Sequence, residues 1–175
     1  MSKLLRRFGR DQRGIAAVEV AMVVGLFAVG GMNATDVGRY AYQTSQVNAA
    51  AQAGAEAALN TCDLAHTPAT LNCAGLVPAV TAGVQSTTLG TQVTIDGAVS
   101  EGWYCLDTSG TLQLAGTASS KPADCSGISA PAANATPSLY MQVPVTYPFQ
   151  PLFPGLTLAQ TFTSAIKRTA WMRMA

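Results

Sequence analysis

Charged side chains are scarce in this sequence of 175 residues: only 11% are Asp, Glu, Lys or Arg, and the one histidine is His66. A Ser-His-Asp or Cys-His site would have to use His66, which lies in a Pro- and Thr-containing stretch beside cysteines. No glycine-rich phosphate loop followed by Lys-Ser or Lys-Thr occurs, and no His-Glu-x-x-His motif. We therefore predict a protein that is not an enzyme, with no cofactor and no small-molecule substrate.

Basic residues are equally scarce beyond the start of the chain. Five of the ten basic residues precede residue 14: Lys3, Arg6, Arg7, Arg10 and Arg13. Asp11 is the one acidic residue in the same stretch. No basic or aromatic surface is indicated elsewhere, which argues against a nucleic-acid partner. Clustered arginine before an apolar run is typical of the cytoplasmic flank of a membrane segment.

The four cysteines lack the CxxC pairs of a usual zinc site, so we predict no metal site. Cys62, Cys73, Cys105 and Cys125 allow three pairings, among which the sequence does not choose. Short loops close most easily, which favours the local pairs Cys62–Cys73 and Cys105–Cys125. Disulfides are typical of a domain outside the cytoplasm.

Residues 15–32 are apolar or glycine except for Glu19. As a helix they would span about 27 Å, close to the hydrocarbon thickness of a bilayer. A carboxylate within a bilayer costs on the order of 2.5–3.5 kcal/mol, so a simple anchor has no use for Glu19. If the chain is cut after Gly14, the new α-amino group of Ile15 is a cation that Glu19 of a neighbouring subunit can neutralise.

This arrangement resembles the type IV pilin and pseudopilin family, and more narrowly the TadE-like pseudopilins of tight-adherence (Flp-type) pilus systems. The matching residues are Arg13-Gly14 with Ala17-Val18-Glu19, the run from Val143 to Leu156, and the closing stretch from Arg168 to Arg173. Val20 departs from the family, where an aromatic residue often follows the glutamate.

The resemblance implies a non-enzymatic minor pseudopilin that a prepilin peptidase cuts between Gly14 and Ile15, with Glu19 registering subunits. Its implied partners are the prepilin peptidase, the major Flp pilin, other pseudopilins and the inner membrane. It implies a single-pass protein of the bacterial inner membrane with its head in the periplasm, which can also enter an extracellular pilus.

Two alternatives remain open at the level of sequence. The small residues at 28–31 would also suit conventional signal-peptide cleavage, which would leave Glu19 without a role. The chain could instead be a membrane-tethered periplasmic or surface binding or adhesion protein, with Trp103, Tyr104 and Tyr140 as contact residues.

The pattern predicts an α+β fold. No proline occurs between Met1 and Thr67, so we expect one pilin-type helix over about residues 15–59, about 67 Å long, packed on a small antiparallel β head with disulfides. The predicted division is a leader (1–14), a hydrophobic membrane or filament-core helix (15–32), its amphipathic continuation (33–60) and a β-rich head (61–175).

Strands are expected at 91–95, 103–106, 111–114, 139–147 and within 162–174. Pro144 should place its strand at an edge or at a bulge.

Overall fold

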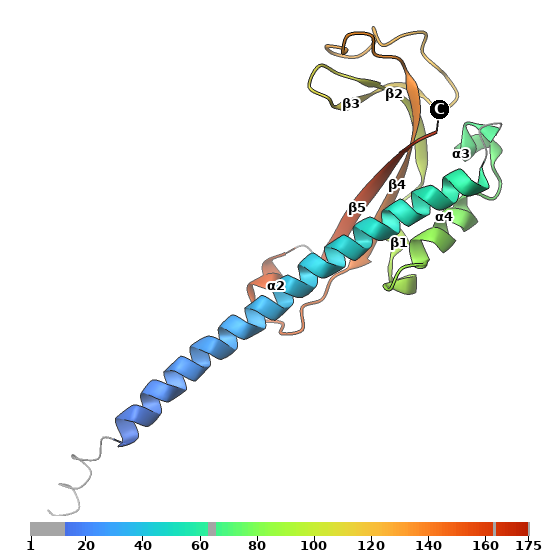
Figure 1. Cartoon of the computed structure of the whole chain (residues 1–175). Helices are drawn as coiled ribbons and strands as arrows, with labels where there is room; N and C mark the ends of the chain where they lie inside the picture. Colours follow the sequence, from blue (N-terminus) through green and yellow to red (C-terminus); the bar gives the residue numbers. More distant parts are fainter. Residues whose placement is uncertain (1–12, 63–65, 163, 175) are drawn as a thin grey trace, which may run out of the picture. The chain divides into compact units, whose positions relative to one another are not determined.

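The computed structural model describes residues 13–62, 66–162 and 164–174. The chain divides into two compact units, Met1–Ala41 with Gln150–Thr163 and Tyr42–Phe149 with Ser164–Ala175. Residues 1–12 of the predicted leader lie outside the described residues. Figure 1 shows helix α2 (Arg13–Thr61), which contributes residues to both units. The predicted α+β fold with one long amino-terminal helix is confirmed.

In the second unit, α2 presents a buried face of small residues. This face consists of Val47, Ala50, Ala51, Gly54, Ala55 and Ala58. Helix α4 (Leu76–Gln85) approaches it closely: a Cβ atom added at Gly83 would lie 2.7 Å from the Ala53 carbonyl oxygen, and one added at Gly54 would lie 2.6 Å from a Val84 methyl group. Glycine and alanine at these positions therefore allow the two helices to pack in close contact.

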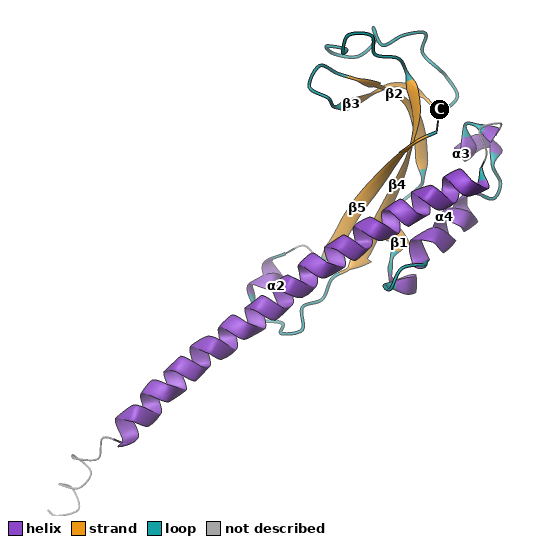
Figure 2. Cartoon of the chain, in the orientation of Figure 1, coloured by secondary structure: helices purple, strands orange, loops and turns teal. Residues whose placement is uncertain are grey.

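We predicted a β-rich head from residue 61 onward, and the second unit contains an antiparallel sheet. It also contains α4 and the single turn α3 (Ala69–Asn72) (Figure 2). Pro78 is the third residue of α4, where a backbone N–H has no partner within the helix and a proline is tolerated. Leu76, Val80 and Val84 recur every four residues and are buried. This spacing is typical of a helix, which we did not predict from the sequence.

The second unit also holds a five-stranded antiparallel sheet. Its strands are β1 (Thr94–Ile95), β2 (Ser100–Leu106), β3 (Leu112–Thr117), β4 (Ser138–Pro148) and β5 (Ala165–Arg173). β4 is central: β5 pairs with it over residues 140–148, and β1 and β2 pair with its other side at 145–146 and 138–142. The expected alternation holds, because one face of β4 is buried: Leu139, Met141, Val143, Val145 and Tyr147. Only the end of the strand expected at 91–95 forms, since residues 90–92 make a 3-10 turn.

Pro144 lies in this central strand, so the expectation of a strand edge is wrong. Its carbonyl oxygen accepts a hydrogen bond from the Asp96 N–H at 2.9 Å, just beyond the last paired residue of β1. A proline has no N–H to return to Asp96. The missing donor therefore faces the interval between the end of β1 and the start of β2, where Gly97 turns the chain with a φ of +92°.

Two disulfides link Cys62 to Cys73 and Cys105 to Cys125, the two local pairs that loop closure favours. The second disulfide, together with Ile128, forms a small buried cluster under the long loop between β3 and β4. Asp107 closes the β2–β3 turn, where its carboxylate accepts the N–H groups of Ser109 and Thr111 at 2.8 and 2.9 Å.

Candidate functional site

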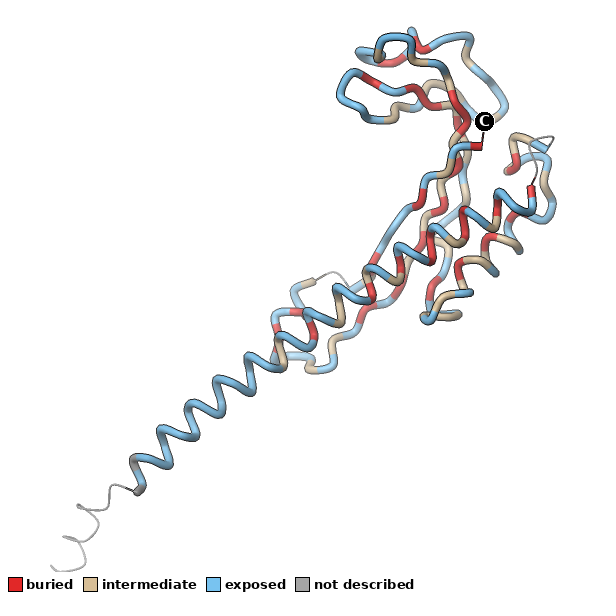
Figure 3. Tube along the Cα trace, viewed as in Figure 1, coloured by how far each residue is buried: buried red, intermediate tan, exposed pale blue. Residues whose placement is uncertain are grey.

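The first part of α2 is an exposed apolar helix. Between residues 18 and 29 its large apolar side chains are 52% to 75% exposed: Val18, Val20, Met22, Val23, Val24, Leu26, Phe27 and Val29. Figure 3 shows this exposure along the first part of the helix. A contiguous apolar surface of this kind marks a membrane or protein contact rather than a surface meant for water. By length and composition α2 is long and apolar enough to cross a membrane.

The predicted processing and registration residues lie at the start of this helix. Gly14 and Ile15 are in its first turn, and Glu19 is exposed one turn further on. Met22, Val23 and Leu26 follow at three, four and seven residues and share its side of the helix. Within the part of the chain that the structure describes, no hydrogen bond or ion pair engages the Glu19 carboxylate. A single acid on an apolar surface is suited to a partner that another molecule supplies.

Small residues interrupt the apolar surface on a second side of the helix. Ala17, Ala21 and Gly25 recur every four residues and are exposed. A Cβ atom added at Gly25, Gly30 or Gly31 would meet no atom within 4 Å. Nothing in the described part of the first unit fills the space beside these glycines, so another helix can approach the backbone closely there.

Just after the apolar segment, Asp36 fastens a loop from the far end of the sequence to α2. Its carboxylate is buried and accepts three hydrogen bonds: from the Leu152 N–H at 2.9 Å, the Phe153 N–H at 3.3 Å and the Thr157 hydroxyl at 2.8 Å. Burial opposes ionisation of Asp36, but these donors and the nearby Arg39 outweigh it and lower the pKa of the carboxyl below its ordinary value. The loop is therefore bound to a charged acceptor.

Three further side chains of α2 hold the same loop, residues 150–163. Arg39 donates to the Gln150 carbonyl at 3.3 Å, and the rings of Tyr40 and Phe162 lie 4.7 Å apart. Asn33 accepts the Leu158 N–H at 2.8 Å. These contacts and those of Asp36 were not predicted, because they join residues that are far apart in the sequence, 111 positions for Arg39 and Gln150. The one available signal was local: polar residues at 33, 36 and 39 form a stripe along one side of the helix.

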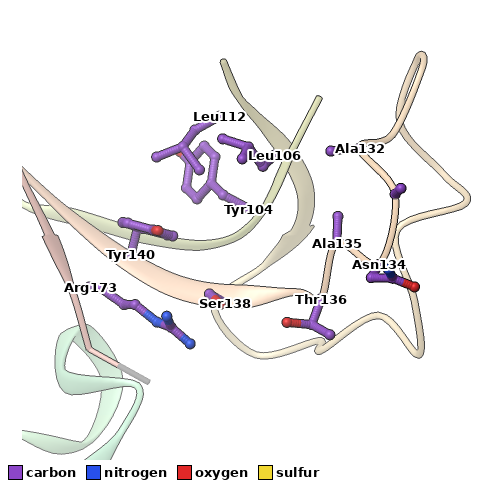
Figure 4. A pocket seen from close by; sticks show the side chains of 11 residues that line it. Tyr104, Leu106, Leu112, Ala132, Asn134, Ala135, Thr136, Ser138, Tyr140 and Arg173 are labelled. Carbon is purple, nitrogen blue, oxygen red and sulfur yellow. The ribbon is translucent and has the colours of Figure 1, made fainter. Parts of the chain in front are cut away.

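The head contains a pocket of about 300 Å³, which bears on the alternative of a binding protein. Figure 4 shows Tyr104, Tyr140 and Arg173, from β2, β4 and β5, around it, with the segment 134–136 opposite. The rings of Tyr104 and Tyr140 meet edge to face at 6.1 Å. Trp103 lies elsewhere, with its Nε1 donating to the Ala118 carbonyl at 3.4 Å and Lys121 4.8 Å above its ring. Of the three aromatic residues singled out from the sequence, two therefore share a site.

The remaining candidate residues form no chemical centre. His66 is exposed. Within residues 13–62, 66–162 and 164–174, no three His, Cys, Asp or Glu side chains gather where a metal ion could be held. The four cysteines are joined in the two disulfides.

Residues 14–56 match the family model described as TadE-like protein. No curated protein and no solved structure matches the chain. TadE-like proteins are a structural, pilus-associated family not known for enzymatic activity. The match begins at Gly14 and takes in the exposed apolar helix, Glu19 and Asp36. Over residues 14–56 the chain is similar to the TadE-like family, and this match is consistent with a TadE-like protein of tight-adherence pilus systems.

Proposed function

We propose that this protein is a structural minor pseudopilin that takes part in assembly of a tight-adherence pilus. The observation that carries the proposal is that the family match and the apolar segment start at nearly the same residue. The TadE-like match starts at Gly14, and the apolar segment 15–32, in which Glu19 is the one charged residue, follows directly. A helix of this kind can reside in the membrane before assembly and in a helical bundle afterwards.

In the proposed pathway, a prepilin peptidase cuts between Gly14 and Ile15. Cleavage removes five basic residues and one acid, so the remaining chain holds five basic and eight acidic residues. Because the cut precedes the apolar segment, α2 stays on the mature protein as its anchor. The segment 15–32 then serves as the membrane and filament-core helix, and residues 33–60 continue it toward the head.

Glu19 has a specific role in this proposal. Cleavage creates an α-amino group at Ile15, and Glu19 of one subunit pairs with that amine in the next. Its exposed position on an apolar helix, without a partner among the described residues, supports this role. An ion pair inside an apolar bundle fixes the stagger of two helices, because a shift in either direction leaves both charges unpaired.

The proposed partners are the prepilin peptidase, the major Flp pilin and other pseudopilins, and the proposed location is the inner membrane with the head in the periplasm. The basic residues before Gly14 favour a cytoplasmic start of the chain. The two disulfides favour a head outside the cytoplasm.

The mass of the mature amino terminus tests the proposal. We expect membrane-purified protein to begin at Ile15, and Gly14→Leu to leave the precursor uncut. Gly38→Leu is the matched control, since Gly38 also stands in α2 with no atom near its missing Cβ. A mature chain that begins at Met1, or one that begins after Gly30 or Gly31, would refute the proposal. A start at Met1 would favour the alternative of a tethered binding protein, because a tether needs no cleavage.

A further inference from the structure

The loop 150–163 carries no charged residue: its polar side chains are those of Gln and Thr. Three of its leucines are exposed, Leu152 at 53%, Leu156 at 62% and Leu158 at 69%. Exposed apolar side chains on an uncharged loop indicate a surface that meets an apolar medium or partner.

The contacts with α2 fix where these leucines lie along the helix. The ends of the loop, Gln150 and Phe162, contact Arg39 and Tyr40. Its middle reaches back to Asp36, and the Leu158 N–H reaches Asn33. Asn33 follows directly after the last residue of the apolar segment 15–32, about 1.5 Å further along the helix axis. The loop thus extends toward the apolar segment, and Leu158 lies level with its end.

The loop is also held in one conformation. Phe153-Pro154-Gly155-Leu156 forms a turn in which the Leu156 N–H donates to the Phe153 carbonyl at 3.2 Å and Gly155 has a φ of +84°. Proline followed by glycine in this conformation is the pattern of a type II turn. The Gly155 N–H donates to the Gln160 side chain at 3.0 Å. Asp36 accepts hydrogen bonds from three further groups of the loop, so the backbone that carries the exposed leucines is held against α2.

We propose that the loop 150–163 inserts its leucines into the boundary between lipid headgroups and acyl chains when residues 15–32 span the bilayer. The inference rests on the proposed membrane anchor. Apolar side chains gain free energy at this depth, and the exposed side chains of Gln150 and Gln160 can bond to headgroups. A charged residue in the loop would oppose insertion at this depth, and the loop has none. Leu158 lies level with the end of the exposed apolar segment of α2, which favours lipid over a separate protein partner.

Depth-dependent quenching in lipid nanodiscs tests the proposal on the full chain. Leu158→Trp places an indole on the loop, and its backbone N–H still reaches Asn33. Phe27→Trp marks the anchor, and Leu114→Trp marks an exposed leucine of the second unit, 61% exposed. The emission of Trp103 and Trp171 in the wild type is subtracted. Phosphatidylcholine brominated near the headgroup is compared with lipid brominated deep in the acyl chains.

We expect the added emission of Leu158→Trp to shift to the blue and to be lost mostly to the shallow bromines. Phe27→Trp should be quenched by the deep bromines. If Phe27→Trp is quenched while Leu158→Trp matches Leu114→Trp, the loop proposal is overturned and the anchor stands. If neither is quenched, the membrane anchor itself is refuted. If Leu158→Trp shifts only after purified major pilin is added, the loop docks on protein and the proposal is again overturned.

Discussion

Three carboxylates show how the surroundings of single residues divide their roles. Glu19 stands exposed among apolar side chains, Asp36 is buried and holds a loop, and Asp107 closes a turn. Asp36 and Asp107 have their acceptor positions filled within the protein. Glu19 does not, within the described residues, and it is the one that we assign to another subunit.

Glu19→Ala should separate membrane insertion from assembly. A lone span loses only a carboxyl group that is costly to place within a bilayer, so the mutant protein should accumulate in the membrane. In a bundle, the Ile15 amine of a neighbour would be left buried without its partner, at a cost of roughly 3–5 kcal/mol. We expect normal membrane levels with co-purification of the major pilin reduced by at least about 100-fold.

Glu56→Ala is the control for this change, because Glu56 is an exposed glutamate of the same helix. The measurement is a pull-down of processed protein with the major pilin and partner pseudopilins. If Glu19→Ala co-purifies and supports piliation as well as Glu56→Ala does, the charge-pairing role is wrong.

Asp107 should make the stability of the head depend on acidity. Hydrogen bonds from the Ser109 hydroxyl, the Thr111 N–H and the Gln113 side chain lower its pKa from 3.8 to about 2. On acidification the unfolded chain takes up a proton first, so this contribution to stability is complete above the unfolded value of 3.8 and is lost as the pH falls toward about 2.

Urea unfolding followed by tryptophan emission, from about pH 5 down to about pH 2, measures this effect, because that interval contains both the unfolded and the folded pKa of Asp107. The wild type should lose stability over the interval, and Asp107→Asn should lose less. Equal losses in the two proteins would show that Asp107 is not responsible.

At the scale of elements, close packing of α4 against α2 depends on missing side chains. Gly83→Ala would place a methyl group 2.7 Å from the Ala53 carbonyl oxygen and from the Ala57 Cβ. Backbone cannot move aside as a flexible side chain can, so we expect a loss of about 1–3 kcal/mol in unfolding free energy. Gly38→Ala, with no atom within 4 Å, should be neutral or stabilising by up to about 1 kcal/mol. Thermal unfolding of the two mutants checks the contrast, and similar melting temperatures would contradict it.

The elements that sequence predicted well are those whose signal is local. The absence of proline before Thr67 predicted α2, and the alternation from Leu139 to Tyr147 predicted β4. Helix α4 was not predicted, although Pro78 lies in its first turn, where proline does no harm. The position of Pro144 in a central strand depends on where β1 ends and β2 begins, which no short stretch of sequence determines.

The candidate site divides in the same way. Gly14, Ile15 and Glu19 could be singled out because they stand within six residues of one another at the start of an apolar run. Asp36 could not, because its partners Leu152, Phe153 and Thr157 follow only after most of the head in the sequence. Polar residues on a helix have many uses, and only the fold identifies this one.

At the scale of the whole molecule, the two units differ in how they are held. Among the described residues of the first, hydrogen bonds and an aromatic contact join α2 to the loop 150–163. The second combines a sheet, helices and both disulfides. Disulfides form outside the cytoplasm, so the oxidation state of the second unit reports its compartment.

We therefore expect no thiol to react with a maleimide–polyethylene glycol reagent in protein denatured directly from cells under acid quench. After reduction, four should react, seen as four steps in gel mobility, since Cys62, Cys73, Cys105 and Cys125 are all paired. Removing Cys105 and Cys125 together should cost about 3 kcal/mol of stability. Four reactive thiols without reduction would place the head in the cytoplasm and contradict the proposed topology.

The bend at Gly97, opposite Pro144, has a practical consequence for following this protein in cells. β1 ends before Gly97 and β2 begins after it, and each strand pairs with β4 in its own register. Extra residues inserted at Gly97 therefore shift the pairing of neither strand with β4. Gly97 and Ala98 are exposed. Under the proposed cleavage, a tag placed before Gly14 would be removed with the leader. An epitope between Gly97 and Ala98 would instead travel with the mature chain, so that an antibody could trace it from the membrane into a filament.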